Sequence, residues 1–262
     1  MSRNIFVLIF CAFSSLAKAQ TNTDSTTTAP VIEVCKALAD SAYANEHFAE
    51  AAALYRQLTD SLGPSPQIFY NIGNCFYRQD SIAQAILYYE RALLYDPSHK
   101  DARFNLDIAR AKTIDKVVPA SEMFFAKIFH SIVLSLSITR WAQIAIVSFI
   151  LALLGLALYL FLPSLAAKKA SFVLAIILFL ITFFANIAAF TQRSHMNSRT
   201  GAIIMTPSVV VKSTPAAAGT DLFILHQGTH VDIRDNSMKD YVEIQLTDGK
   251  QGWIPRNQLE II

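Results

Sequence analysis

Trp141 to Leu162 reads WAQIAIVSFILALLGLALYLFL, and Phe172 to Phe190 reads FVLAIILFLITFFANIAAF. Each run is about 20 residues long, and at ~1.5 Å of rise per residue a helix of that length matches the ~30 Å hydrocarbon core of a bilayer. A helix in a soluble core needs only one apolar stripe, whereas these runs are apolar on all sides. We therefore predict a hairpin of two transmembrane helices, 141–162 and 172–190, joined by a turn over 163–171.

The hairpin is predicted to be an anchor. A transporter or a proton path needs ionisable groups inside the bilayer, and neither run contains Asp, Glu, Lys, Arg or His. We expect the amides Gln143 and Asn186 to form hydrogen bonds between the two helices. Two spans return the chain to the side from which it left, so the soluble parts before and after the hairpin share one compartment.

Residues 1–19 have the layout of a secretory signal peptide. An apolar run from Ile5 to Phe13 follows a short basic start, and Ala17-Lys18-Ala19 fits a cleavage site. Basic residues flank the spans on both sides, so the predicted orientation depends mainly on this signal. It predicts a protein of the inner (plasma) membrane, with both soluble domains in the periplasm and the turn at 163–171 in the cytoplasm.

The composition excludes several classes of function. The formal net charge is +2 and the chain has no large cluster of Lys and Arg, so we expect no nucleic-acid partner. The sequence has no G-x-S-x-G, H-E-x-x-H, Walker A or metal-spaced Cys/His pattern. We therefore predict no enzyme, no cofactor and no metal site, although catalysis by scattered residues stays open. Cys35 and Cys75 are expected to be two buried free thiols, because the predicted helical register separates them by ~9 Å along the helix axis.

A self-similarity with a spacing of 34 residues marks the first soluble segment: Phe48–Ala51 falls on Ile82–Ala85, and Tyr55 falls on Tyr89. This is the period of the tetratricopeptide (TPR) repeat, a pair of helices. The residues that match its pattern most fully are Phe69, Ile72, Gly73, Phe76, Ala85, Tyr89, Ala92 and Pro97. We predict a polar linker over 20–30 and all-α TPR repeats over 31–113, with a closing helix that begins at Lys100.

The first helices of TPR pairs form a concave face, and the residues that we expect to bind a partner lie there. They are Lys36, Asp40, Tyr43, Gln67, Tyr70, Asn71, Asn74, Tyr77, Phe104 and Asn105. Rings interleaved with amides suit an extended peptide, because the amides can pair with its backbone while the rings supply buried area. Packing between repeats is an equal alternative for Tyr70 and Tyr77, whereas amides are seldom found in a core.

An amphipathic helix is predicted over 120–136, between the repeats and the first span. Ser121 can cap it, and apolar residues recur at helical spacing from Phe124 to Leu136. We expect it to lie in the membrane interface. A cap on the repeat stack is the alternative.

The C-terminal segment, 200–262, changes to short alternating runs separated by turn residues. The runs are Ala202–Met205, Val209–Lys212, Leu222–Leu225, His230–Arg234 and Tyr241–Leu246. Five short strands favour a small closed barrel. The stretch from Gly249 to Pro255, GKQGWIP, resembles the end of a bacterial SH3 domain. Trp253 is the candidate surface recognition residue of this SH3-like barrel, with packing under the last strand as the alternative.

A signal peptide, a short TPR array, two spans and an SH3-like domain, in this order, resemble the Bacteroides aerotolerance BatE family over essentially the whole mature chain. The resemblance implies an accessory protein that works with von Willebrand A domain membrane proteins and a MoxR-type ATPase under oxidative or envelope stress. The leading hypothesis is therefore a membrane-anchored periplasmic scaffold for protein–protein interaction. The alternative is a cell-wall protein that binds peptidoglycan through the SH3-like domain.

Overall fold

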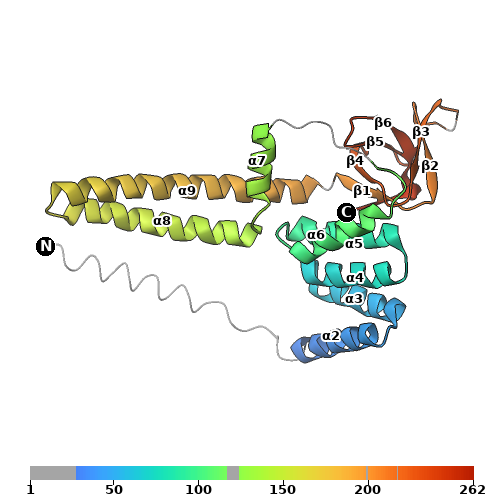
Figure 1. Ribbon diagram of the computed structural model, residues 1–262, viewed down its shortest axis with the longest axis horizontal. Coiled ribbons are helices and arrows are strands. Elements are labelled where there is room, and N and C mark those ends of the chain that lie inside the picture. The colour runs from blue at the N-terminus through green and yellow to red at the C-terminus, as the bar shows by residue number, and fades with distance from the viewer. Residues whose placement is uncertain (1–27, 117–123, 199, 217) are drawn as a thin grey trace.

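The computed structural model describes residues 28–116, 124–198, 200–216 and 218–262 (Figure 1). The predicted signal peptide lies outside these residues, as do most of the predicted linker and residues 120–123 of the predicted amphipathic helix. The described chain contains a helical array, two long antiparallel helices and a C-terminal antiparallel sheet. These three parts confirm the predicted fold class, apart from the closure of the barrel.

The helical array consists of five helices. They are α2 (Thr28–Ala44), α3 (Phe48–Leu62), α4 (Pro66–Arg78), α5 (Ile82–Tyr95) and α6 (Lys100–Ala111). The turns within the two pairs repeat the same backbone geometry: Glu46 and Asp80, 34 residues apart, both have a positive φ. Gly73 lets α4 and α5 approach closely, because a Cβ atom there would lie 2.6 Å from the ring of Tyr89. The small residues of the repeat pattern therefore set the helix spacing.

Two long helices follow, α8 (Ile138–Phe161) and α9 (Leu165–Ser198), and both are long and apolar enough to cross a membrane. Most of their apolar side chains are exposed on all sides, unlike those of a soluble core helix. Helix α8 begins three residues before the predicted span and ends one residue short of it, whereas α9 extends beyond its predicted span at both ends. The early start of α9 shortens the connection to residues 162–164. The helices differ from the predicted spans because the apolar pattern indicates only which residues suit a bilayer. Helical hydrogen bonding continues into polar residues beyond the apolar run.

Small side chains form the contact between α8 and α9. Ala145, Ala152 and Gly155 are buried on α8, and a Cβ atom at Gly155 would lie 3.3 Å from that of Ala175. The hydrogen bond between the two helices joins Ser148 Oγ and Thr182 Oγ1 at 2.8 Å. The prediction that Gln143 and Asn186 form hydrogen bonds between the two helices was wrong, because both side chains are exposed and face away from the contact between α8 and α9.

A short helix, α7 (Phe124–Val133), lies across the ends of the pair within the segment predicted to be amphipathic. The carbonyl of Val133 accepts hydrogen bonds from Trp141 Nε1 at 3.0 Å and from Gln192 Nε2. Trp141 is on α8 and Gln192 is on α9, so the end of α7 is fixed to both long helices.

The C-terminal sheet has seven strands. They are β1 (Gly201–Ile204), β2 (Ser208–Lys212), β3 (Asp221–His226), β4 (His230–Asp235), β5 (Tyr241–Gln245), β6 (Gln251–Pro255) and β7 (Leu259–Ile261). Their order is β3-β2-β6-β5-β4-β1-β7, and the sheet does not close into the predicted barrel. The outer edge of β7 is taken by the array, because Arg91 of α5 donates to the carbonyl of Ile261 at 2.6 Å and pairs with Glu260 at 3.0 Å. The Arg91 side chain thus takes a backbone acceptor on the edge to which a closing strand would have to bond.

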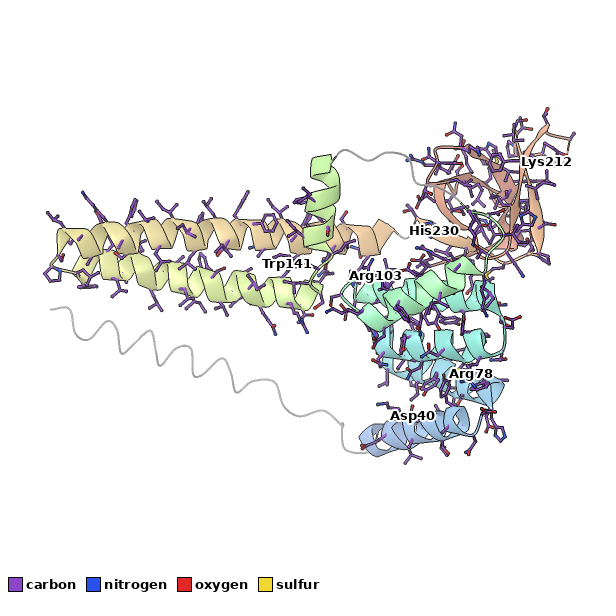
Figure 2. All side chains as sticks on the ribbon, in the orientation of Figure 1. Asp40, Arg78, Arg103, Trp141, Lys212 and His230 are labelled. Carbon is purple, nitrogen blue, oxygen red and sulfur yellow. The ribbon has the colours of Figure 1, made fainter. Side chains whose placement is uncertain are left out.

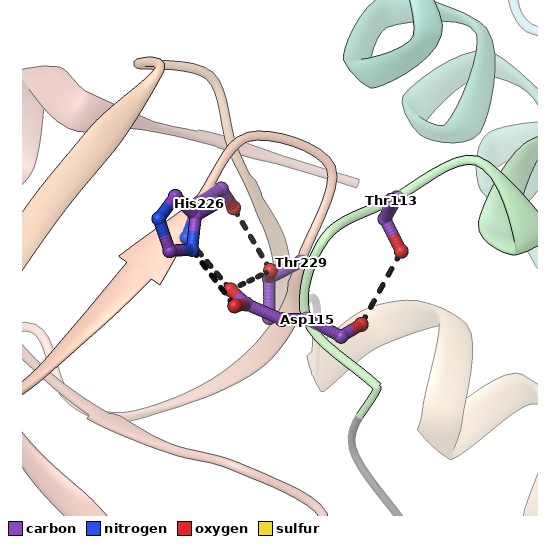
Figure 3. A network of polar contacts seen from close by, with 4 residues as sticks. All are labelled: Thr113, Asp115, His226 and Thr229. Atoms are coloured by element: carbon purple, nitrogen blue, oxygen red, sulfur yellow. Dashed lines mark hydrogen bonds and ion pairs between the residues drawn. The ribbon is translucent and has the colours of Figure 1, made fainter.

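The sheet and the helical array pack together as one soluble head. Ile203 of β1 is fully buried within the core of the array, and Met205 and Ile262 pack against that core. Asp115, just after α6, holds the turn between β3 and β4 (Figure 3): its carboxylate accepts from His226 N at 2.7 Å and from Thr229 Oγ1 at 2.7 Å. It also lies 2.8 Å from His226 Nδ1. Burial by itself raises the pKa of Asp115, but the bonds from His226 and Thr229 outweigh it and hold that pKa below its usual range.

Candidate partner-binding groove

A groove of about 230 Å³ lies where the first helices of the array, α2, α4 and α6, meet. Its lining combines tyrosine rings, amides, one guanidinium and one aliphatic side chain. The residues are Tyr43, Tyr70, Asn74, Tyr77, Arg78, Tyr89, Asn105 and Ile108.

Hydrogen bonds between helices hold the floor of this groove. Asn74 Oδ1 accepts from Tyr89 OH at 2.8 Å and from Asn105 Nδ2 at 2.9 Å. Asn105 Nδ2 also lies 3.4 Å from Tyr70 OH. Burial raises the pKa of Tyr89 well above its usual value, so its hydroxyl stays a hydrogen-bond donor at all physiological pH values. The floor is therefore fixed before any partner arrives.

Five of the ten residues predicted for the concave face line the groove: Tyr43, Tyr70, Asn74, Tyr77 and Asn105. The structure brings them together from three helices. It also shows that Asn74 and Asn105 bond to neighbours within the array, so these amides have a structural role whether or not they touch a partner.

The other five predicted residues lie outside the groove. Lys36 and Phe104 are exposed, and Phe104 keeps 67% of its surface accessible. Asp40 accepts a hydrogen bond from Tyr55 OH of α3. Gln67 Nε2 donates to Asn71 Oδ1 at 3.2 Å along α4. Asp40, Gln67 and Asn71 thus have partners within the array, whereas Lys36 and Phe104 extend the concave surface beyond the groove.

Three lining residues were not predicted: Arg78, Tyr89 and Ile108. Ile108 lies one helical turn after the predicted Phe104, so the spacing within α6 could have found it. Tyr89 belongs to a second helix of a pair and reaches the groove between α4 and α6. No pattern in the first helices could have shown this.

Two pairs of opposite charges lie at one end of the groove. Arg78, labelled in Figure 2, stacks over the ring of Phe48 at 4.7 Å and lies 3.4 Å from Glu46. Lys112 Nζ lies 4.5 Å from the centre of the Tyr77 ring and 3.5 Å from Asp80. In the described part of the chain no group of three His, Cys, Asp or Glu side chains could hold a metal ion. The rings and amides of the lining suit an extended peptide with apolar side chains.

Trp253 of the SH3-like segment lies on β6 and is half-buried, with Lys212 of β2 and Glu243 of β5 as its strand neighbours. The preceding Gly252 is buried, and a Cβ atom there would lie 2.5 Å from Val211 Cγ1. The glycine of the GWIP stretch is therefore explained by close packing of β6 on β2. The role of Trp253 stays a prediction.

A family model for the tetratricopeptide repeat matches residues 36–102. The match runs from within α2 to the start of α6, so α3, α4, α5 and most of α2 lie within TPR repeats, whereas Asn105 and Ile108 of α6 lie beyond the matched residues. A search of curated proteins gives no significant match. No family match supports the resemblance to the BatE family or to bacterial SH3 domains, and both stay predictions.

Proposed function

We propose that the protein is a membrane-anchored scaffold whose TPR groove binds an extended segment of a partner protein. The observation that carries this proposal is the groove itself, in which a fixed polar floor is lined by aromatic rings and stays open on the concave side. TPR arrays use such concave surfaces for protein–protein interaction. Within the described chain the sheet contacts the array at Arg91 of α5 and at Asp115 after α6, and it contributes no residue to the lining of the groove.

The anchor of the scaffold is the pair α8 and α9. A bilayer would cover their exposed apolar side chains, which no described part of the chain covers. The hairpin leaves the array and the sheet on one side of the membrane. The predicted signal peptide supports the periplasmic side of the inner membrane.

The resemblance to the BatE family supports a partner among von Willebrand A domain membrane proteins, acting with a MoxR-type ATPase under envelope stress. In this proposal the groove holds one such protein near the membrane surface. The scaffold has no catalytic task of its own.

Partner capture by variants of the exposed concave face of α6 tests the proposal. Phe104 and Ile108 lie on the concave side of α6 with 67% and 38% of their surfaces accessible, so replacing both by Ala removes contact area without opening the core. The partner is first identified by cross-linking the wild-type protein to its neighbours in membranes. We expect Phe104→Ala/Ile108→Ala to weaken capture of that partner at least about tenfold. Leu62→Ala is the control, because Leu62 is also an exposed apolar residue, with 51% of its surface accessible, and lies at the end of α3 outside the lining of the groove. Equal capture by the double variant and the wild type would exclude the groove as the binding site.

A further inference from the structure

Helix α9 carries a second apolar seam beside the one that contacts α8. The seam toward α8 includes Ser171, Ala175, Ala185 and Ala188, all buried. The second seam is rotated about 100° around the helix and repeats at alternating intervals of four and three residues, the spacing by which two helices pack along a seam. Its members are Phe172, Ile176, Phe179, Phe183, Asn186 and Phe190.

Most of the second seam is uncovered in the described chain. Phe179, Phe183 and Phe190 keep 58%, 63% and 75% of their surfaces accessible. Helix α7 packs on another side of α9, where the rings of Phe129 and Phe184 lie 6.2 Å apart. At the start of the seam Phe172 contacts α8, where its ring lies 5.4 Å from that of Tyr159. Among the described residues, neither α7 nor α8 covers Phe179, Phe183 or Phe190.

Asn186 places an amide in this seam, near its C-terminal end. Its Nδ2 donates to the carbonyl of Thr182 at 2.8 Å, and no described residue donates to its Oδ1. The residue lies between the basic ends of α9, Lys169 and Arg193, and about 10 Å before Arg193 along the axis. Lipid tails cannot supply the missing hydrogen bond, and an unpaired amide in hydrocarbon is costly.

We propose that α9 pairs with α9 of a second copy of this chain across the second seam. The inference rests on the membrane insertion proposed above. All inserted copies have the same orientation, so a second copy brings an identical amide to the same depth. The remaining Nδ2 hydrogen of each Asn186 can then donate to Oδ1 of the other, which satisfies both amides. A helix of another protein would need a polar group at that depth by coincidence.

Sedimentation equilibrium of the full-length protein in neutrally buoyant micelles tests the pairing. We expect the wild type to dimerise, and Asn186→Leu to raise the dissociation constant at least about tenfold, since two hydrogen bonds between helices are lost. Asn186→Gln, which keeps the amide, is expected to retain the dimer.

Gln143→Leu is the matched control. Gln143 is also an exposed amide, and because Ser148 and Thr182 are paired, the antiparallel helices place it at a depth similar to that of Asn186. It lies on the side of α8 opposite to α9, so the variant should dimerise like the wild type. A monomeric wild type, an unaltered Asn186→Leu variant, or an equal loss in Gln143→Leu would each overturn the proposal.

Cross-linking in membranes locates the contact. Phe183→Cys should form a disulfide-linked dimer on mild oxidation, whereas Leu180→Cys, on the opposite side of α9 from α8, should not; the reverse pattern would refute this seam. Alkaline carbonate extraction distinguishes failure of the membrane anchor from failure of the α9 pairing. Release of the wild type from membranes would refute the anchor itself, whereas a retained but monomeric protein would refute only the pairing.

Discussion

Asn74 joins three helices of the array through a single oxygen atom. Tyr89 OH and Asn105 Nδ2 both donate to it, and Tyr89 is completely buried. A buried hydroxyl left without an acceptor costs about 1–3 kcal/mol, whereas replacing both partners of the bond by apolar groups can be nearly neutral. The amide that suits partner binding is thus also a structural element of the groove.

We expect Asn74→Ala to lower the free energy of unfolding by about 1–3 kcal/mol, because Tyr89 OH loses its acceptor. Adding Tyr89→Phe should recover part of this loss, since the unpaired hydroxyl is then gone. Denaturant unfolding of the wild type, both single variants and the double variant measures the effect. A double variant that is less stable than Asn74→Ala would contradict this account of the floor.

The thiols differ in their surroundings. Both described cysteines are free, as predicted; Cys75 is buried, but Cys35 is only half-buried, contrary to the expectation that both would be. Burial raises the pKa of Cys75 to about 12, so only about one thiol in 10⁴ is ionised at pH 8. Because the folded state favours the neutral thiol, this contribution to stability is complete below pH ~8.5 and declines above it.

We therefore expect a disulfide reagent at pH 8 to modify Cys35 in the native protein while Cys75 reacts only after unfolding. Mass spectrometry of the labelled peptides distinguishes the two residues. Equal rates at both cysteines would show that α4 is not packed as described.

At the level of elements, the turn between β3 and β4 is attached to the array by one carboxylate. Asp115 receives the backbone N–H of His226 and the hydroxyl of Thr229, and bonds to a charged acceptor contribute about 1.5–3 kcal/mol. We expect Asp115→Ala to speed hydrogen exchange at residues 226–229 and to lower the free energy of unfolding by about 2 kcal/mol. Asp221→Ala should change it by less than about 0.5 kcal/mol, because Asp221 forms an exposed ion pair with Lys212.

The attachment of the β3–β4 turn by Asp115 should weaken at low pH. The pKa of Asp115 is lower in the folded protein than in the unfolded chain, so its contribution is complete above pH ~4 and declines as the pH falls through the lowered pKa. Wild-type exchange at residues 226–229 should therefore approach that of Asp115→Ala only in strong acid. Convergence near neutral pH would contradict the role given to this carboxylate.

The contact of α8 with α9 depends on small side chains. Gly155→Leu places a large side chain where Ala175 Cβ lies 3.3 Å from a Cβ position, and overpacking of this kind costs about 1–3 kcal/mol. We expect a lower melting temperature in micelles for this variant. Ala142→Leu, on an exposed side of α8, adds the same kind of bulk and should leave the melting temperature unchanged.

The sequence predicted those elements whose signal is local. The 34-residue spacing predicted α3, α4 and α5, and the length of the apolar runs predicted α8 and α9. Strand β6 was missed because its glycine and proline weaken a strand pattern, and β7 was missed because it has only three residues. The packing of the sheet on the array could not be predicted, because Asp115 and His226 are 111 residues apart and neither lies in a recognisable pattern.

At the level of the whole molecule, one hairpin places the array and the sheet on the same side of the membrane. A cysteine introduced at Ser61 in the array or at Ser213 in the sheet should react with an impermeant reagent from one side, and a cysteine at Ser164, between α8 and α9, from the other. All three positions are exposed, and a Cys35→Ser background removes the accessible native thiol. Labelling of Ser61→Cys and Ser213→Cys from opposite sides would refute the hairpin.

The direct passage from α9 into the sheet has a mechanical consequence. Strand β1 begins three residues after α9 ends, and its Ile203 is buried in the core of the array. Three residues of extended chain reach at most about 11 Å. In the proposed membrane setting the head is therefore tethered close to the lipid surface, and the groove can meet only partner segments within that short radius.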